Sequence, residues 1–243
     1  MNPAYLVFLL AALITAIAIF SVRSYRRHHE TVARAFMECG YYEVPQVDDD
    51  IRVALHGPWA ADDRQRRNRR YIGKTFRYHA GGMELYLFDP EPSESNNRTM
   101  VIRFSQLILP RFILSPKIPL GGRLGRFINL LSEKIISRQL PSVRLNLSPE
   151  FDARYYLFGN LPEEIKKFLD EPMLRWLESC NRRLMLSVDR HLLTLSYSDV
   201  TNLKQLSKKR PLSGNYIREM TAIARDIYQH LYQAGRSDKA VTT

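Results

Sequence analysis

The sequence predicts an α+β protein in which an N-terminal transmembrane helix is followed by antiparallel strands, with helices packed on one face of the sheet. Three observations carry this prediction. Residues 4–22 (AYLVFLLAALITAIAIFSV) contain no charged side chain. Several runs between residues 72 and 197 alternate apolar and polar residues, which is typical of half-buried strands. Residues 215–234 carry apolar side chains every three or four positions, as a helix covering a sheet does.

The uncharged stretch, from Ala4 to Val22, has the length of a membrane span. As a helix it would be roughly 28 Å long, close to the hydrocarbon thickness of about 30 Å. No Lys or Arg precedes it and no small-residue cleavage site follows it, which argues against a secretory signal peptide. Because Arg23, Arg26 and Arg27 follow directly, we expect residues 1–3 outside and the remainder of the chain in the cytoplasm.

Residues 23–63 are predicted to form a helical stalk and a linker. Val32, Ala35, Phe36 and Cys39 recur at helical spacing. The linker contains the acidic run 48–50, interpreted as a solvated turn because three consecutive Asp lack the spacing of a calcium loop. A short apolar piece after it, residues 51–55, is expected to lead into the first strand.

Composition describes a folded, basic body of about 220 residues, enough for one large domain. The chain has 243 residues, 45% of them hydrophobic and 25% charged, and a formal net charge of +11. A basic protein suits anionic lipid headgroups or nucleic acid, although the excess charge also serves solubility. The two cysteines, Cys39 and Cys180, form no disulfide framework, and no spacing indicates a metal ion or a cofactor.

The most basic stretch lies at residues 64–70, where five arginines occupy seven positions. Such a run must be on the surface, since unpaired charges are costly to bury. We interpret it as a candidate anion- or headgroup-binding segment. No aromatic side chains are interleaved with the arginines, so nucleic acid is the less favoured partner. The candidate residues are Arg64, Arg66, Arg67, Arg69 and Arg70.

The body, residues 64–235, begins with a predicted three-stranded meander. Strands are expected at 74–79, 83–88 and 100–104, with a Gly-Gly turn after the first and a polar loop, 89–98, after the second.

Residues 104–132 contain no Asp or Glu and mix apolar side chains with four basic ones. Two interpretations remain open: a segment that lies on a membrane surface, or a buried strand pair around 107–114 with prolines in its turns. A helix follows at 124–139, with Phe127, Leu130, Leu131 and Ile135 on one broad face and Ile136 as a further candidate for it. The glycines before it, together with Arg123 and Arg126, form a second candidate anion site at a helix N-terminus.

The second half of the body alternates short strands and helices. We predict strands at 143–147 and 151–158, helices starting at Pro162 and covering 173–180, and a hairpin over 184–197. A basic segment, 202–209, is expected to be a short helix. A longer helix over 215–234 should end at Gly235, before a disordered tail at 236–243.

The order of these features resembles a set of bacterial single-pass membrane-anchored proteins of unknown function. The resemblance rests on the strand-like Phe151–Phe158, the two-helix segment through Leu177-Glu178 and the hairpin Leu184–Tyr197, and covers about residues 70–235. It implies a bacterial inner-membrane protein and carries over no active-site residue.

Three functions follow as expectations. The favoured one is an interaction or scaffold module at the membrane surface that binds headgroups or a protein through a basic face. An alternative is a membrane-tethered enzyme acting on a phosphorylated lipid or nucleotide; no catalytic motif supports it. A third is a membrane-associated nucleic-acid-binding module using residues 64–70.

Overall fold

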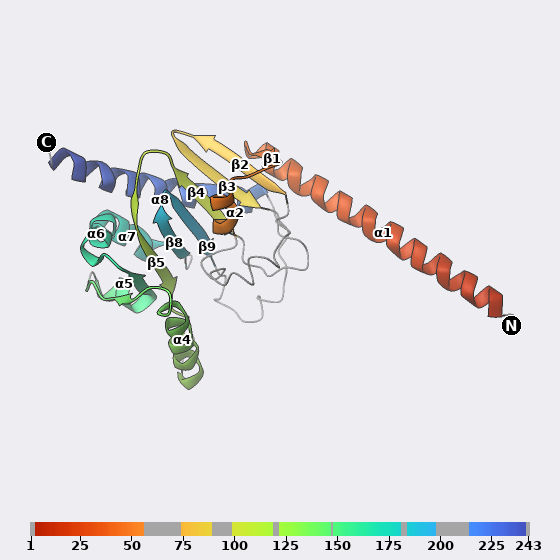
Figure 1. The fold of residues 1–243 in the computed structure, drawn as a ribbon, viewed down its shortest axis with the longest axis horizontal. Coiled ribbons are helices and arrows are strands. Elements are labelled where there is room, and N and C mark those ends of the chain that lie inside the picture. The colour runs from red at the N-terminus through yellow and green to blue at the C-terminus, as the bar shows by residue number, and fades with distance from the viewer. Residues whose placement is uncertain are drawn as a thin grey trace.

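A single antiparallel sheet organises the chain (Figure 1). The computed structural model describes residues 3–55, 74–88, 99–118, 122–146, 148–180, 184–197 and 214–241. Nine strands of these residues pair in the order β1-β2-β3-β4-β9-β8-β5-β7-β6. The strands are β1 (Tyr42–Val44), β2 (Thr75–Ala80), β3 (Met83–Phe88), β4 (Thr99–Phe104), β5 (Leu109–Pro116), β6 (Ser142–Val143), β7 (Tyr155–Gly159), β8 (Leu184–Arg190) and β9 (Leu192–Tyr197). The α+β class is therefore as predicted, including the β2–β3–β4 meander and the β8–β9 hairpin.

The largest part of the core lies between the sheet and the long C-terminal helix. The described helices are α1 (Pro3–Glu38), α2 (Asp49–Leu55), α4 (Gly122–Ile136), α5 (Pro149–Arg154), α6 (Pro162–Phe168), α7 (Glu171–Ser179) and α8 (Gly214–Val241). The apolar stripe of α8 is completely buried, because its 3,4 spacing keeps one face on the sheet. Helices α6 and α7 and the last turns of α1 pack around α8 in the same layer.

The other face of the sheet is also covered, in two smaller clusters. Ile51 of α2 packs on Tyr86 and Val101. Ile136, at the end of α4, packs with Ile113 and with two further apolar side chains, Leu140 and Phe158. The expectation that helices occupy one face only is therefore wrong: α2 and the end of α4 lie on the second face.

The predicted transmembrane helix over residues 4–22 is also wrong. Among the residues that the structure describes, no helix is both long and apolar enough to cross a membrane. The single-pass topology and the bacterial inner-membrane location were deduced from the Ala4–Val22 anchor. Both predictions are therefore wrong together with the anchor.

Three local predictions also need correction. Residues 51–55 are helical, because the acidic run supplies Asp49 and Asp50 to the first turn of α2, where carboxylates stabilise a helix. The predicted strand 151–158 begins as the helix α5, which Ser148 caps.

Helix α8 continues past Gly235 to Val241. Gly235 instead allows close packing, since a Cβ there would lie 2.3 Å from Leu107 Cδ1. The segment 202–209 lies outside the described residues.

Candidate functional site: the outward face of helix α4

Helix α4 turns four of its large apolar side chains away from the body. Phe127 and Leu130 are each 63% exposed, Leu131 is 48% exposed and Ile135 is 42% exposed. At about 100° per residue these four side chains share one side of the helix. We call this surface the outward face of α4. Monomeric soluble proteins rarely leave a contiguous apolar patch of this kind without a role in binding.

The inward side of α4 combines small, polar and apolar residues. Gly125 and Ile136 are buried, and Asn129 and Ser132 are partly buried. The side-chain oxygen of Asn129 accepts a hydrogen bond from the Ile118 N–H at 2.7 Å, and its amide donates to the Ile118 carbonyl at 3.1 Å. These two bonds and the packing of Ile136 fix the rotation of the helix. The outward face is thus a consequence of how α4 is anchored.

Basic side chains accompany the outward face. Arg123, Arg126 and Lys134 are all exposed, whereas Glu133, the single acidic residue in the α4 sequence, is partly buried. By helical geometry, Arg123 and Lys134 fall in the arc between Leu130 and Phe127, and Arg126 lies just beyond Leu130. The helix therefore combines an apolar strip with a local positive charge.

Of the two predicted groups of anion-binding residues, one lies on α4 and the other lies outside the described residues. Arg123 and Arg126 lie on α4, beside its outward face, and Gly122 at the start of the helix has a φ of +78°. The run from Arg64 to Arg70 lies outside the described residues. Among the described residues, no group of three His, Cys, Asp or Glu side chains is placed to hold a metal ion.

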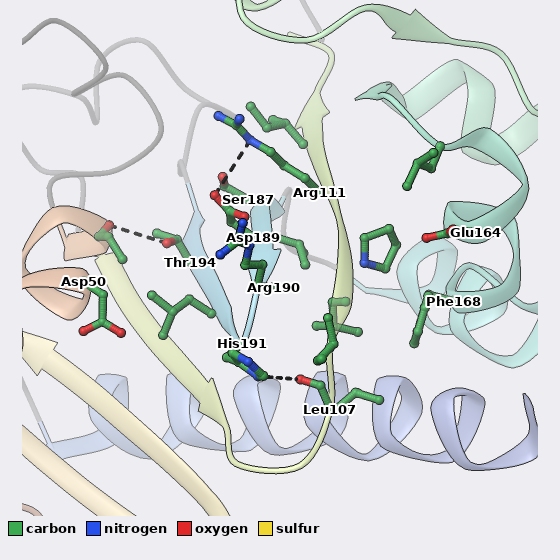
Figure 2. A pocket seen from close by; sticks show the side chains of 18 of the residues that line it. Asp50, Leu107, Arg111, Glu164, Phe168, Ser187, Asp189, Arg190, His191 and Thr194 are labelled. Carbon is green, nitrogen blue, oxygen red and sulfur yellow. Dashed lines mark hydrogen bonds and ion pairs between the residues drawn. The ribbon is translucent and has the colours of Figure 1, made fainter. Parts of the chain in front are cut away.

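A second candidate is an open groove of about 1360 Å³ between α2, the β4–β5 connection, β8–β9 and α6 (Figure 2). Its polar side chains mostly contact one another or the backbone. Arg111 pairs with Asp189 at 3.8 Å, and His191 Nδ1 lies 3.1 Å from the Leu107 carbonyl, to which it donates. Thr194 donates to the Ala54 carbonyl at 3.4 Å. Neither Arg123 nor Arg126 lines this groove.

The wall of the groove formed by α2 is held by ion pairs. Arg103 of β4 contacts Asp48 at 2.7 Å and Asp50 at 2.9 Å. Below them, the Tyr86 hydroxyl donates to Glu84 at 2.9 Å. Burial, and then the hydrogen bond to Glu84, raises the pKa of Tyr86 to about 12. The ion pairs of Arg103 connect the start of α2 to the sheet. The groove itself is lined by charges of both signs.

Sequence reasoning found the residues of the outward face but not its direction. Periodicity grouped Phe127, Leu130, Leu131 and Ile135 on one side, but Ile136, a further candidate for that face, is buried. Of the two interpretations of residues 104–132, burial is correct for the part around 107–114, which includes the buried strand β5. Nothing in the sequence pointed to the groove, because its lining comes from six separate segments of the chain. His191 is exposed at the β8–β9 turn.

Comparisons with known proteins add little to this geometry. No protein-family model matches the chain, and no curated protein matches it. Among solved structures, it is similar to the crystal structure of the mycobacterial trehalose monomycolate transport factor A, TtfA. The TM-score is 0.47 and the sequence identity 9%, over 85% of this chain and 97% of that chain. At this TM-score and identity, the likeness carries no inference about what the chain binds or does.

Proposed function

We propose that this protein is an interaction module that docks onto a partner surface through the outward face of α4. The observation that carries the proposal is the rotation of α4, which turns four large apolar side chains toward solvent, while Gly125, Asn129, Ser132 and Ile136 face the body. Folding alone favours the opposite rotation, since each buried Leu or Phe side chain contributes about 1.5–3 kcal/mol. An interface on this face would recover that contribution on binding.

The enzymatic alternative has less support. It requires Arg123 and Arg126 to hold a phosphate beside catalytic groups, yet both arginines extend from α4 and are absent from the groove lining. The nucleic-acid alternative depends on residues 64–70, which lie outside the described residues. We therefore favour docking over either alternative.

The proposal is tested by retention of the intact protein on an octyl-derivatised matrix. The double variant Leu130→Gln/Leu131→Gln removes apolar area from the outward face. A matched control, Ile108→Gln/Leu161→Gln, removes side chains that are 70% and 49% exposed and line the groove instead. Both variants should unfold like the parent protein in urea, because the replaced side chains are largely solvated.

We expect the α4 variant to elute clearly earlier than the parent and the control to elute near it. The exposed apolar residues of α1 are the same in all three proteins, so they do not affect the comparison. If the control loses retention and the α4 variant does not, the groove is the apolar docking site and the proposal is wrong.

A further inference from the structure

We infer that the partner of the outward face is an anionic lipid surface, on which α4 lies flat in the headgroup region without crossing it. This inference rests on the proposed function and names the occupant of the same site. The argument comes from the shape of the face, from the position of its basic residues and from the place of α4 in the fold.

The outward face has the composition of an interfacial helix, with apolar side chains accompanied by Arg and Lys. From Phe127 to Ile135 it extends roughly 12 Å along the helix axis, at about 1.5 Å per residue. Amphipathic helices of this type bury an apolar face at the boundary between headgroups and acyl chains. Helix α4 also lies at the periphery and projects from the body, so a flat surface can approach it (Figure 1).

The basic residues distinguish a lipid surface from an apolar groove on another protein. Arg123 and Lys134 fall inside the apolar arc, between Leu130 and Phe127. Buried against an apolar protein surface, these cations would lose their hydration without gaining a counter-charge. At a lipid surface their long side chains extend past the apolar strip to the phosphates, as interfacial Lys and Arg side chains do.

A second copy of the chain is a less suitable occupant. Two outward faces brought together would place Arg123, Arg126 and Lys134 of one copy near the same residues of the other. Four exposed apolar side chains also supply much less than the about 800 Å² per partner that a stable protein interface buries. An anionic lipid surface avoids both difficulties. Its phosphates neutralise the three cations, and its flat area is not limited by the size of a protein partner.

The test uses a fluorophore that reports contact with lipid at α4 itself. In the full chain carrying Cys39→Ala and Cys180→Ala, Leu130→Cys is labelled with an environment-sensitive nitrobenzoxadiazole dye. The matched control is Lys166→Cys, an exposed position on α6. Vesicles of phosphatidylcholine alone are compared with vesicles that also contain phosphatidylglycerol, each at low and at high salt.

We expect a blue shift at position 130 with phosphatidylglycerol vesicles, reduced by salt, and no shift at position 166. Changing Arg123, Arg126 and Lys134 to Gln should weaken vesicle binding on the order of a hundredfold, since three surface charges each contribute to attraction. Equal shifts with both vesicle types would overturn the assignment of an anionic surface.

The absence of any shift at position 130 would overturn the lipid inference as a whole. This includes the case in which the protein reaches vesicles through another surface, such as the exposed apolar residues of α1. The proposed function is judged separately. If Leu130→Gln/Leu131→Gln still reduces retention on the octyl matrix, the outward face remains an apolar docking surface and only its assignment to lipid is wrong. If it does not, the proposed function itself fails.

Discussion

The Tyr41 hydroxyl lies 2.6 Å from the Thr221 hydroxyl in the core, joining the end of α1 to α8. Thr221 donates its own proton to the Ile217 carbonyl at 2.7 Å. Tyr41 is therefore the donor to Thr221. Both side chains are buried, so this bond connects the projecting helix to the main core without competition from water.

Replacing Tyr41 by Phe should lower the free energy of unfolding by about 0.5–1.5 kcal/mol, the net contribution of a buried hydrogen bond. The loss stays small because Thr221 keeps its bond to Ile217. Urea unfolding measures the change, with Tyr42→Phe as the control, since Tyr42 is 47% exposed. Equal stability of Tyr41→Phe and the parent would show that the bond contributes nothing.

Alkaline pH should destabilise the protein in part through Tyr86. Its pKa is raised to about 12 by burial and by the hydrogen bond to Glu84, whereas an unfolded tyrosine titrates near about 10. Above about pH 10 the unfolded state loses this proton while the folded state retains it, so stability falls as the pH rises toward 12. Below about pH 10 this contribution is fully present.

Urea unfolding at about pH 9 and about pH 11 checks this prediction. The parent should lose more stability between the two than Tyr86→Phe, by on the order of 1 kcal/mol. Burial also raises the pKa of Tyr41, so part of the alkaline loss should remain in the variant. Parallel losses in parent and variant would contradict the role of Tyr86.

The ion pairs of Arg103 should control how tightly α2 covers the second face of the sheet. Asp48→Asn weakens the 2.7 Å contact, whereas Asp49→Asn changes a neighbouring carboxylate that is 92% exposed and pairs with Arg52 instead. Because the Asp48 side chain is itself 68% exposed, the effect should be at most about 1 kcal/mol.

Hydrogen exchange of the α2 amides measures this opening directly. We expect exchange to accelerate roughly two- to fivefold in Asp48→Asn and to stay near the parent rate in Asp49→Asn. High salt should reduce the difference between the two variants. Identical exchange in both would show that Ile51, which is fully buried, holds α2 without help from the charges.

The sequence predicted those elements whose side-chain period is unambiguous. Leu184, Leu186 and Val188 alternate in β8 and are buried, and the stripe of α8 from Ile217 to Leu231 is buried as expected. The outward direction of α4 could not be predicted in the same way. Periodicity shows which residues share a face, but the direction of that face depends on the distant contacts of Asn129 and Ile136.

Helix α5 was missed although its signals were present. Ser148, Pro149 and the acidic Glu150 form a helix start, but the aromatic run that follows, from Phe151 onward, has a high strand propensity. Each signal predicts the structure of its own part of the segment. The cap at Ser148 starts one short helix, and the aromatic residues from Tyr155 form β7. The transmembrane prediction is wrong as well, because no helix among the described residues is both long and apolar enough to cross a membrane.

Removing the α5 cap should be measurably destabilising. The Ser148 hydroxyl oxygen accepts a hydrogen bond from the Phe151 N–H at 3.0 Å and the hydroxyl donates to Glu178 of α7. Ser148→Ala should cost about 1 kcal/mol of unfolding free energy, the usual value for an N-cap. Ser137→Ala, which removes an exposed hydroxyl bonded to a backbone carbonyl, is the control and should be near neutral. A neutral Ser148→Ala would mean that Pro149 alone starts the helix.

A close contact between β7 and α6 provides the most stringent test of the packing. A Cβ on Gly159 would lie 2.3 Å from Ile165 Cδ1 and 3.2 Å from the Arg111 carbonyl oxygen. Ile165 is fully buried, so its side chain has little room to move. Gly159→Ala should therefore destabilise the protein by about 1–3 kcal/mol through overpacking.

Ile165→Val removes the methyl group that the new Cβ at position 159 would meet, at its own cost of about 0.5–1.5 kcal/mol. If the contact with Cδ1 is the main obstacle, the double variant should be more stable than the sum of the two single changes predicts, by roughly 0.5–1 kcal/mol. Strict additivity would place the obstacle on β5, at the Arg111 carbonyl oxygen or at Phe112 Cβ, which lies 3.3 Å away, because the second substitution changes neither atom. A double-mutant cycle in urea thus identifies whether the Ile165 side chain or β5 sets the spacing between β7, α6 and β5.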